Sequence, residues 1–162
     1  DRDLLATNAH VVGNRDNVNV RVFFPSAGKW AKGPINGRVV FMDPTRDLAL
    51  VKVRTDLDFL KLGDSDRLKK GEDIVVIGSP GLGNGVLENA VFKGLYSTTL
   101  DVGGEGSYLH MALSVNPGNS GGPALNDRGE VVGVVTAKAK KGEQITLCIP
   151  VNDLKLAIAN AQ

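Results

Sequence analysis

The chain has 162 residues, enough for one large domain or two small lobes that fold without crosslinks. Its 19 basic and 18 acidic residues give a net charge of +1, so no global field favours nucleic acid or an anionic membrane as a partner. The single cysteine, Cys148, excludes a disulfide within the chain, and no apolar run approaches the ~18 residues that span a bilayer. We therefore expect neither nucleic-acid binding nor membrane insertion.

Short β-branched runs separated by 20 glycines predict a mostly β protein. The stretch from Val18 to Phe24 alternates apolar and polar residues, as a strand with one buried face does. A short strand at Leu4–Thr7 precedes it. Further strands are expected at 35–42, 48–53, 73–78, 86–97, 108–114, 123–126, 130–137 and 144–149.

One helix is predicted, at the C-terminal end of the chain. Asn152 can cap its first turn. The apolar positions that follow recur with helical spacing and form one stripe, which predicts that this face packs on the β structure. The stripe consists of Leu154, Ala157, Ile158 and Ala161.

A polar connector at 63–71 separates two β-rich halves and predicts an N-terminal lobe at 1–65 and a C-terminal barrel with its helix at 66–162. The second half supplies about six strands, enough to close a small barrel. The first half supplies three strong strands and the short one at Leu4–Thr7. A matching first barrel would lack about two strands, so the chain is expected to begin in mid-domain.

The most specific motif is Pro117–Pro123, which surrounds Ser120 with small residues. Ser120 also fits the G-x-S-x-G elbow of α/β-hydrolases, but in that class the catalytic histidine follows the serine. The two histidines, His10 and His110, both precede it. With Asp47 placed between His10 and Ser120, the chain has the histidine–aspartate–serine order of chymotrypsin-type enzymes.

These residue types form a nucleophilic site. A serine hydroxyl needs a base to take its proton, which His10 would do, while Asp47 would fix the tautomer of the imidazole. The backbone N–H groups of Gly118 and Ser120 would form an oxyanion hole. Asp43 competes with Asp47 for the orienting role, but it precedes a proline and suits a turn, so Asp47 is favoured.

The motifs at Thr7–Val12, Asp47–Val53, Gly78–Pro80 and Asn116–Leu125 resemble the HtrA (Deg) family of trypsin-like serine proteases, and so does the ending Ile149–Asn152. The resemblance implies an all-β, chymotrypsin-like double β-barrel with the site between the lobes, here with an incomplete first barrel. It further implies polypeptide substrates, no metal or other cofactor, and a periplasmic or otherwise extracytoplasmic location. Assembly into a homo-oligomer would use segments outside this chain.

The resemblance also implies the catalytic roles of His10, Asp47 and Ser120, and a set of substrate-binding positions. Ser114 would lie at the base of the pocket for the residue before the cleaved bond (P1), where its neutral side chain argues against Arg and Lys. Thr146 stands where the family usually has glycine and would narrow the pocket. The strand edge expected to pair with the substrate backbone comprises Thr136, Ala137 and Lys138.

The sequence therefore predicts a serine endopeptidase that cleaves unfolded or extended proteins through an acyl-enzyme, in protein quality control. The alternative is a catalytically silent peptide-binding or chaperone-like module with a protease fold. The intact triad argues against this alternative, and the expected shortage of N-terminal strands argues for it. Cys148 lies in an apolar strand and is expected to be a small buried side chain rather than a nucleophile.

Overall fold

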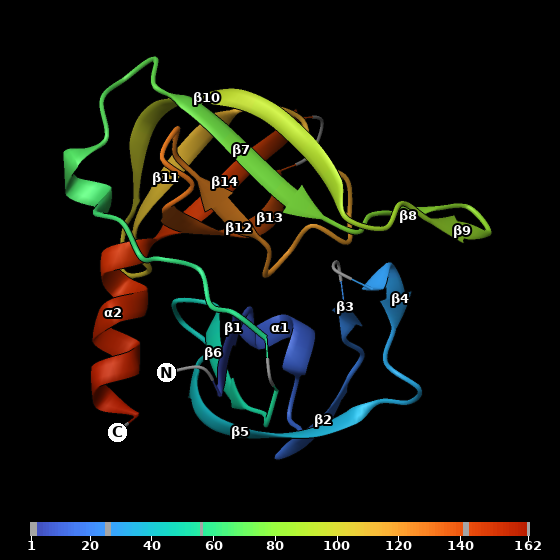
Figure 1. Ribbon diagram of the computed structural model, residues 1–162. Coiled ribbons are helices and arrows are strands. Elements are labelled where there is room, and N and C mark those ends of the chain that lie inside the picture. The colour runs from blue at the N-terminus through green and yellow to red at the C-terminus, as the bar shows by residue number, and fades with distance from the viewer. Residues whose placement is uncertain (1–2, 25–26, 56, 141–142, 162) are drawn as a thin grey trace.

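A computed structural model describes residues 3–24, 27–55, 57–140 and 143–161, which form two β regions with a helix along one flank (Figure 1). The N-terminal region is an antiparallel sheet of four strands in the order β1-β6-β5-β2. A one-turn helix α1 (Ala9–Val12) and a small hairpin of β3 (Phe23–Phe24) and β4 (Lys29–Trp30) complete it. The sheet strands are β1 (Leu4–Thr7), β2 (Asn17–Val20), β5 (Ile35–Asp43) and β6 (Leu48–Lys52).

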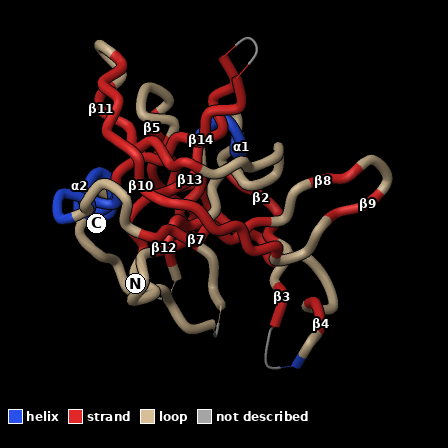
Figure 2. Tube along the Cα trace, turned by 90° about the horizontal axis from the view of Figure 1, so that it is seen from above, coloured by secondary structure: helices blue, strands red, loops and turns tan. Residues whose placement is uncertain are grey.

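The C-terminal region is a closed barrel in the order β10-β11-β14-β13-β12-β7, which confirms the expected six-stranded barrel. A short hairpin of β8 (Gly81–Leu82) and β9 (Gly85–Val86) projects from it, on the same side as the β3–β4 hairpin (Figure 2). The barrel strands are β7 (Asp73–Gly78), β10 (Ala90–Val102), β11 (Gly106–Ala112), β12 (Pro123–Leu125), β13 (Val131–Lys140) and β14 (Glu143–Pro150).

The two regions differ in closure. In the described part of the chain β1 pairs only with β6 and β2 only with β5, so the N-terminal sheet is open at both edges. A groove of about 730 Å³ lies between these edges, lined mainly by apolar side chains with several asparagines. The expected first barrel is thus present as an open four-stranded sheet. Barrels remove exposed edges by closure, and only the second region does so.

Strand β6 joins the two regions because it is buried on both faces. Alternate residues of a strand point to opposite faces. Leu48 and Leu50 pack in a cluster that also contains Tyr108 and Ile149 of the barrel, whereas Ala49 and Val51 pack with Val12 inside the N-terminal region. A separate cluster fills the barrel interior around Ile74, Val76 and Met111. The N-terminal region therefore shares part of its core with the barrel.

Helix α2 (Val151–Asn160) follows β14 directly and packs Leu154 and Ala157 into the shared cluster, as the apolar stripe predicted. The predicted cap is wrong, because the helix begins at Val151 and Asn152 lies inside its first turn. Pro150 is the N-cap residue instead, and it makes no side-chain capping hydrogen bond.

Asn152 instead ties the helix to the connector. Its Nδ2 donates to Oδ1 of Asp64 at 2.9 Å, and its N–H donates to Oγ of Ser65 at 3.3 Å. Asp64 also caps the single-turn helix η2 (Ser65–Arg67) through the N–H of Asp66. The hydrogen bond from Asn152 to the Asp64 carboxylate, and after it the one from the Asp66 N–H, hold the pKa of Asp64 below its usual value. The connector is thus bonded to the start of α2.

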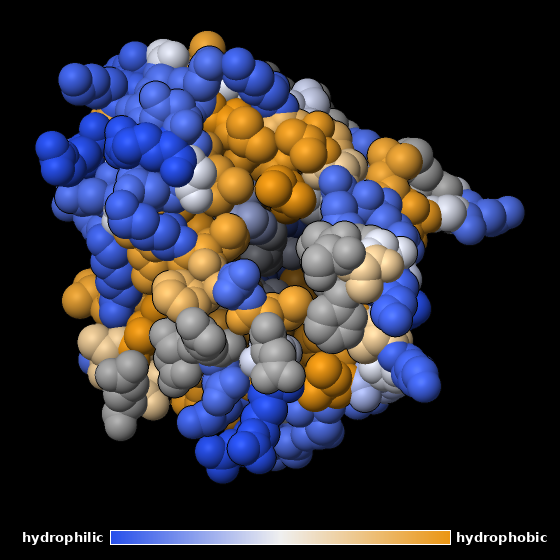
Figure 3. All heavy atoms as spheres, viewed as in Figure 1, coloured by the Kyte–Doolittle hydropathy of each residue, from blue (hydrophilic) through white to orange (hydrophobic). Residues whose placement is uncertain are grey.

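The apolar run at 73–78 predicted the bounds of β7 correctly, whereas several other strand boundaries differ from the prediction. The expected strand from Val18 to Phe24 is two strands, β2 and β3, and the one expected at 86–97 begins at Ala90 and reaches Val102. Helix α1 was not predicted, because four residues carry no periodic signal. No helix in the described ranges is long and apolar enough to cross a membrane. Apolar side chains nevertheless reach the outer surface over the barrel (Figure 3). The exposed apolar side chains of β10 include Val91 and Leu95.

Candidate active site

His10 lies in α1, immediately after β1, and faces the turn that precedes β6. The Nδ1 atom of His10 lies 2.9 Å from Oδ1 and 2.8 Å from Oδ2 of Asp47. The backbone N–H of His10 also donates to Asp47 Oδ1 at 2.9 Å. A carboxylate only accepts hydrogen bonds, so this contact places the ring proton of a neutral His10 on Nδ1 and leaves Nε2 as the free base. His10 is half-exposed, and Asp47 is largely buried.

The turn between β5 and β6 decides between the two candidate acids. Oδ1 of Asp43 accepts the backbone N–H groups of Thr45 at 3.0 Å and Arg46 at 3.1 Å, which is the usual role of aspartate in a turn. Asp47 ends that turn with a φ of 57°, and its carboxylate points to His10. The geometry thus agrees with the expectation that Asp47, and not Asp43, faces the histidine.

Asp47 is held from two further directions. The hydroxyl of Thr136 on β13 donates to Oδ2 of Asp47 at 2.7 Å, although 89 residues separate them. The side-chain amide of Asn8, fully buried, donates to the backbone carbonyl of Asp47 at 3.0 Å. Hydrogen bonds to a carboxylate favour its ionised form and fix its orientation. Neither partner was assigned this role from the sequence, because nothing local to Thr136 or Asn8 points to Asp47.

Ser120 lies in the loop between β11 and β12, which is built for close approach. Gly118 has a φ of 107° and Gly121 one of 85°. A Cβ on Gly118 would lie 2.7 Å from Cα of Pro80, and a Cβ on Gly121 would lie 2.5 Å from Oγ1 of Thr7. Only glycine fits these positions. The loop that carries Ser120 therefore rests on the 79–81 segment on one side and on the end of β1 on the other.

These contacts place the loop that carries Ser120 next to the segments that hold His10 and Asp47, at the boundary between the regions. Gly121 touches Thr7, three residues before His10, and its N–H donates to the carbonyl of Val135 at 2.8 Å. Val135 precedes Thr136, whose hydroxyl bonds Asp47. Ser120 is half-buried here, and within the described residues no hydrogen bond joins it to His10. Catalytic hydrogen bonds are often long in substrate-free structures and shorten when substrate binds.

The other predicted positions lie around this loop. Ser114 is exposed, and Thr146 is buried with its hydroxyl donating to the carbonyl of Leu113 at 2.7 Å. Strand β13 pairs with β12 only as far as Val134, whereas its pairing with β14 continues to Lys140. The backbone edge at Thr136–Lys138 is thus unpaired on one side among the described strands. The side chains of Ala137 and Lys138 lie outside what the structure describes.

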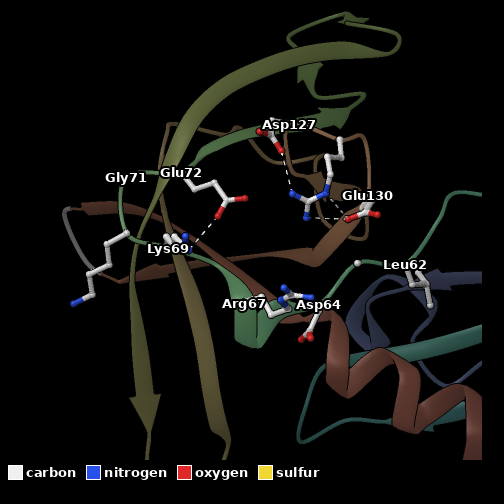
Figure 4. Close-up of a pocket in the computed structure, with 11 residues that line it drawn as sticks. Leu62, Asp64, Arg67, Lys69, Gly71, Glu72, Asp127 and Glu130 are labelled. Carbon is white, nitrogen blue, oxygen red and sulfur yellow. Dashed lines mark hydrogen bonds and ion pairs between the residues drawn. The ribbon is translucent and has the colours of Figure 1, made fainter.

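Two other features do not contribute to this site. Burial raises the pKa of the Cys148 thiol to about 12, which makes it inert as a nucleophile. A cavity of about 840 Å³ beside the connector is lined by Arg67, Lys69 and Arg128 together with carboxylates such as Glu72 (Figure 4). Its lining charges are of both signs, and none of the predicted site residues lines it.

Comparison with known proteins gives one consistent result. Residues 1–134 match the family described as the trypsin-like peptidase domain. The chain is 36% identical over 166 residues to the mitochondrial serine protease HTRA2 of Drosophila grimshawi, with 98% of this chain and 36% of that protein covered. It is 39% identical over 132 residues to a Pseudomonas putida serine endoprotease described as periplasmic and DegP-like, with 79% of this chain and 25% of that protein covered.

Solved structures agree with these relatives. The HtrA-type protease AlgW, solved with a decapeptide, superposes with a TM-score of 0.78 at 30% identity, covering 99% of this chain and 48% of that one. The chain thus spans a quarter to about a third of the curated relatives above and about half of this structure. The chain belongs to the trypsin-like peptidase family, among its HtrA (Deg) serine proteases.

Proposed function

We propose that this chain is the catalytic part of a serine endopeptidase in which Ser120 is the nucleophile, His10 the general base and Asp47 the orienting acid. The observation that carries the proposal is the bonding of Asp47. Its carboxylate accepts from His10 Nδ1, from the His10 N–H and from Thr136 Oγ1, at 2.7–2.9 Å. This arrangement holds the imidazole with Nε2 turned away from the acid, which is what proton transfer from a serine requires.

The reaction would proceed in two steps. Ser120 Oγ attacks the peptide carbonyl while His10 takes its proton, and the leaving amine receives that proton as the acyl-enzyme forms. Water, deprotonated by His10, then hydrolyses the ester and frees Ser120. The N–H groups of Gly118 and Ser120 would stabilise the oxyanion, and the left-handed φ of Gly118 supports this because it turns the loop sharply before the serine.

The substrate class follows from the strand edge and the pocket residues. An extended polypeptide would pair with β13 at Thr136, Ala137 and Lys138, which suits unfolded or stretched protein segments. Neutral Ser114 and Thr146 offer no partner to a basic P1 side chain, whose unpaired burial is unfavourable. We expect Val, Ala, Ile or Leu at P1. The solved relative AlgW, which carries a bound decapeptide, supports peptide recognition by this fold.

The cellular role is protein quality control outside the cytoplasm, with 1–65 and 66–162 acting as two lobes of one enzyme. The relatives include one described as periplasmic and one named mitochondrial, which supports a location away from the cytoplasm. Homo-oligomer formation through segments outside this chain is part of the same proposal.

The test is labelling by a fluorophosphonate probe, which reacts only with an activated serine. We expect covalent labelling of Ser120 in the wild-type protein and none in Ser120→Ala. A correctly folded wild-type protein that binds peptides but takes up no probe would establish the alternative, a catalytically silent peptide-binding module.

A further inference from the structure

Arg46 precedes Asp47 in the turn between β5 and β6, and its side chain leaves the N-terminal region for the barrel. Its Nη1 donates to the carbonyl of Glu105, and its Nη2 donates to the carbonyl of Ser107 at 2.9 Å. Nη2 also pairs with the carboxylate of Asp153 on α2. One side chain therefore joins the acid-bearing turn to both the β10–β11 hairpin and the C-terminal helix.

The surroundings of Arg46 fit a guanidinium closely. Its central carbon lies 4.6 Å from the ring centroid of Tyr108, a fully buried residue of the shared core. The Arg46 side chain itself is only 17% exposed. Gly106 has a φ of 90°, and a Cβ there would lie 2.7 Å from Arg46 Nη1, so glycine leaves room for the guanidinium. A lysine could offer one charge here but neither the planar fork nor the stacking.

The turn that Arg46 anchors contains a backbone conformation that is uncommon outside glycine. Asp47 has a φ of 57°. From one side the carboxylate of Asp43 closes the turn by accepting the N–H groups of Thr45 and Arg46. From the other side the Arg46 side chain fixes the turn to the barrel. Asp47 lies between these two restraints and strand β6, and its carboxylate contacts Nδ1 of His10 and so orients the ring.

We propose that Arg46 is a positioning residue for the triad: by clamping the turn to the β10–β11 hairpin and α2, it holds the Asp47 carboxylate against His10. It touches neither substrate nor reacting atoms. The kinetic consequence rests on the proposed peptidase function, but the structural consequence does not. Loss of Arg46 frees Asp47 to move relative to the barrel and so weakens its bonds to His10 and Thr136.

Amide hydrogen exchange tests the structural step without any need for activity. The N–H of His10 lies in the first turn of α1 and donates to Asp47 Oδ1, whereas the N–H of Gly13 donates to the carbonyl of Ala9 at 2.8 Å within the same turn. In Arg46→Gln we expect the His10 amide to exchange about tenfold faster, and the Gly13 amide to stay within about twofold of wild type. Unchanged exchange at His10, or equal acceleration at both amides, would overturn the proposal.

Kinetics test the functional step. A misplaced acid lowers turnover more than binding, so Arg46→Gln should reduce kcat by roughly 10- to 100-fold with KM within about threefold. Arg46→Lys should recover only part of the loss. Arg128→Gln is the matched control, because Arg128 also bonds a carboxylate, that of Glu130, but lies away from the triad. Its kcat should remain at the wild-type value.

The decisive comparison is a double-mutant cycle with Asp47→Asn. If Arg46 acts through Asp47, then Arg46→Gln should reduce kcat by less than about threefold in the Asp47→Asn background. The same loss in both backgrounds would show that Arg46 acts elsewhere and would overturn the proposal. If Arg46→Gln does not fold, Asp153→Asn removes one anchor alone and should show the same pattern with smaller losses. A wild-type protein without turnover would end the peptidase proposal, while hydrogen exchange would still decide the role of Arg46.

Discussion

The open N-terminal sheet and the closed C-terminal barrel divide the candidate site unequally. The smaller region carries both His10 and Asp47. Among the residues that the structure describes, its own buried cluster consists of Val12, Ala49 and Val51, with partly buried side chains around it. The barrel carries Ser120 on a loop that packs against the 79–81 segment and against Thr7. A region with few buried contacts opens locally more easily. The relative positions of His10 and Asp47 therefore depend on bonds between the N-terminal region and the barrel.

Several contacts that cross between the regions supply this support. Thr136 bonds the acid itself, Arg46 bonds the hairpin and helix of the barrel, and Gly121 packs on Thr7. A hydrogen bond from Trp30 Nε1 to the carboxylate of Glu88, at 3.1 and 3.2 Å, also joins the β3–β4 hairpin to the segment after β9. The difference between the regions teaches that the site is assembled by the interface between them rather than by either region alone.

The largest expected effect concerns the barrel's contribution. Ser120→Ala removes the nucleophile and should lower kcat by roughly 10⁶-fold, as triad serines do in related chemistry. The measurement is hydrolysis of an extended peptide with Val or Ala at P1, with circular dichroism to confirm the fold. Turnover near the wild-type rate would show that the barrel does not provide the nucleophile. It would contradict the proposal that the two regions contribute different members of the triad.

The next effect concerns the N-terminal region's contribution. Asp47→Asn keeps the size of the side chain but lets it donate to His10 Nδ1, which favours the wrong tautomer and should lower kcat about 10⁴-fold. Asp43→Asn is the matched control four residues away, since an asparagine can still accept the N–H groups of Thr45 and Arg46. A larger loss in Asp43→Asn than in Asp47→Asn would reverse the assignment of the acid.

A smaller effect tests the bond between the regions directly. Thr136→Val removes the hydroxyl that donates to Asp47 and keeps the side-chain shape. Hydrogen bonds to charged groups contribute about 1.5–3 kcal/mol, so kcat should fall by roughly 10- to 100-fold. Thr99→Val is the comparison, because the Thr99 hydroxyl bonds the hydroxyl of Tyr96 at 2.7 Å instead. Equal activity in the two variants would mean that the crossing bond does not support the acid.

The smallest effect concerns Glu130, which precedes β13 and pairs with Lys61 on the segment before the connector. Lys61, Asn126 and Arg128 bond Glu130 and lower its pKa to about 2, Lys61 contributing most. A lowered carboxyl pKa contributes stability above the unfolded value of 4.5 that is lost as pH falls towards 2. Glu130→Gln should therefore melt at a slightly lower temperature at pH 7 and lose less stability on acidification over that window. Parallel pH profiles of melting temperature for the two proteins would contradict this.

Features that depend on residues near one another in the sequence could be predicted from the sequence. The apolar run in 73–78 predicted β7, and the polar stretch at 63–71 lies between the strands of the open sheet and those of the barrel. The order His10, Asp47, Ser120 selected one class of site, and the proline after Asp43 separated a turn residue from the facing acid. The strand and turn signals are local, because side-chain period and dihedral preferences depend on nearby residues. The order of the three site residues is read along the whole chain.

What only the tertiary structure decided are the contacts that join distant segments. Thr136 was assigned to the substrate edge, and its hydroxyl is found on Asp47, 89 residues away. Asn152 was assigned as a helix cap, and its side chain bonds Asp64 instead. Sequence by itself determined the types of residue available at the site and their order along the chain. Their partners depend on how the open sheet packs against the barrel, because hydrogen bonds between segments form only at positions that packing brings within about 3 Å.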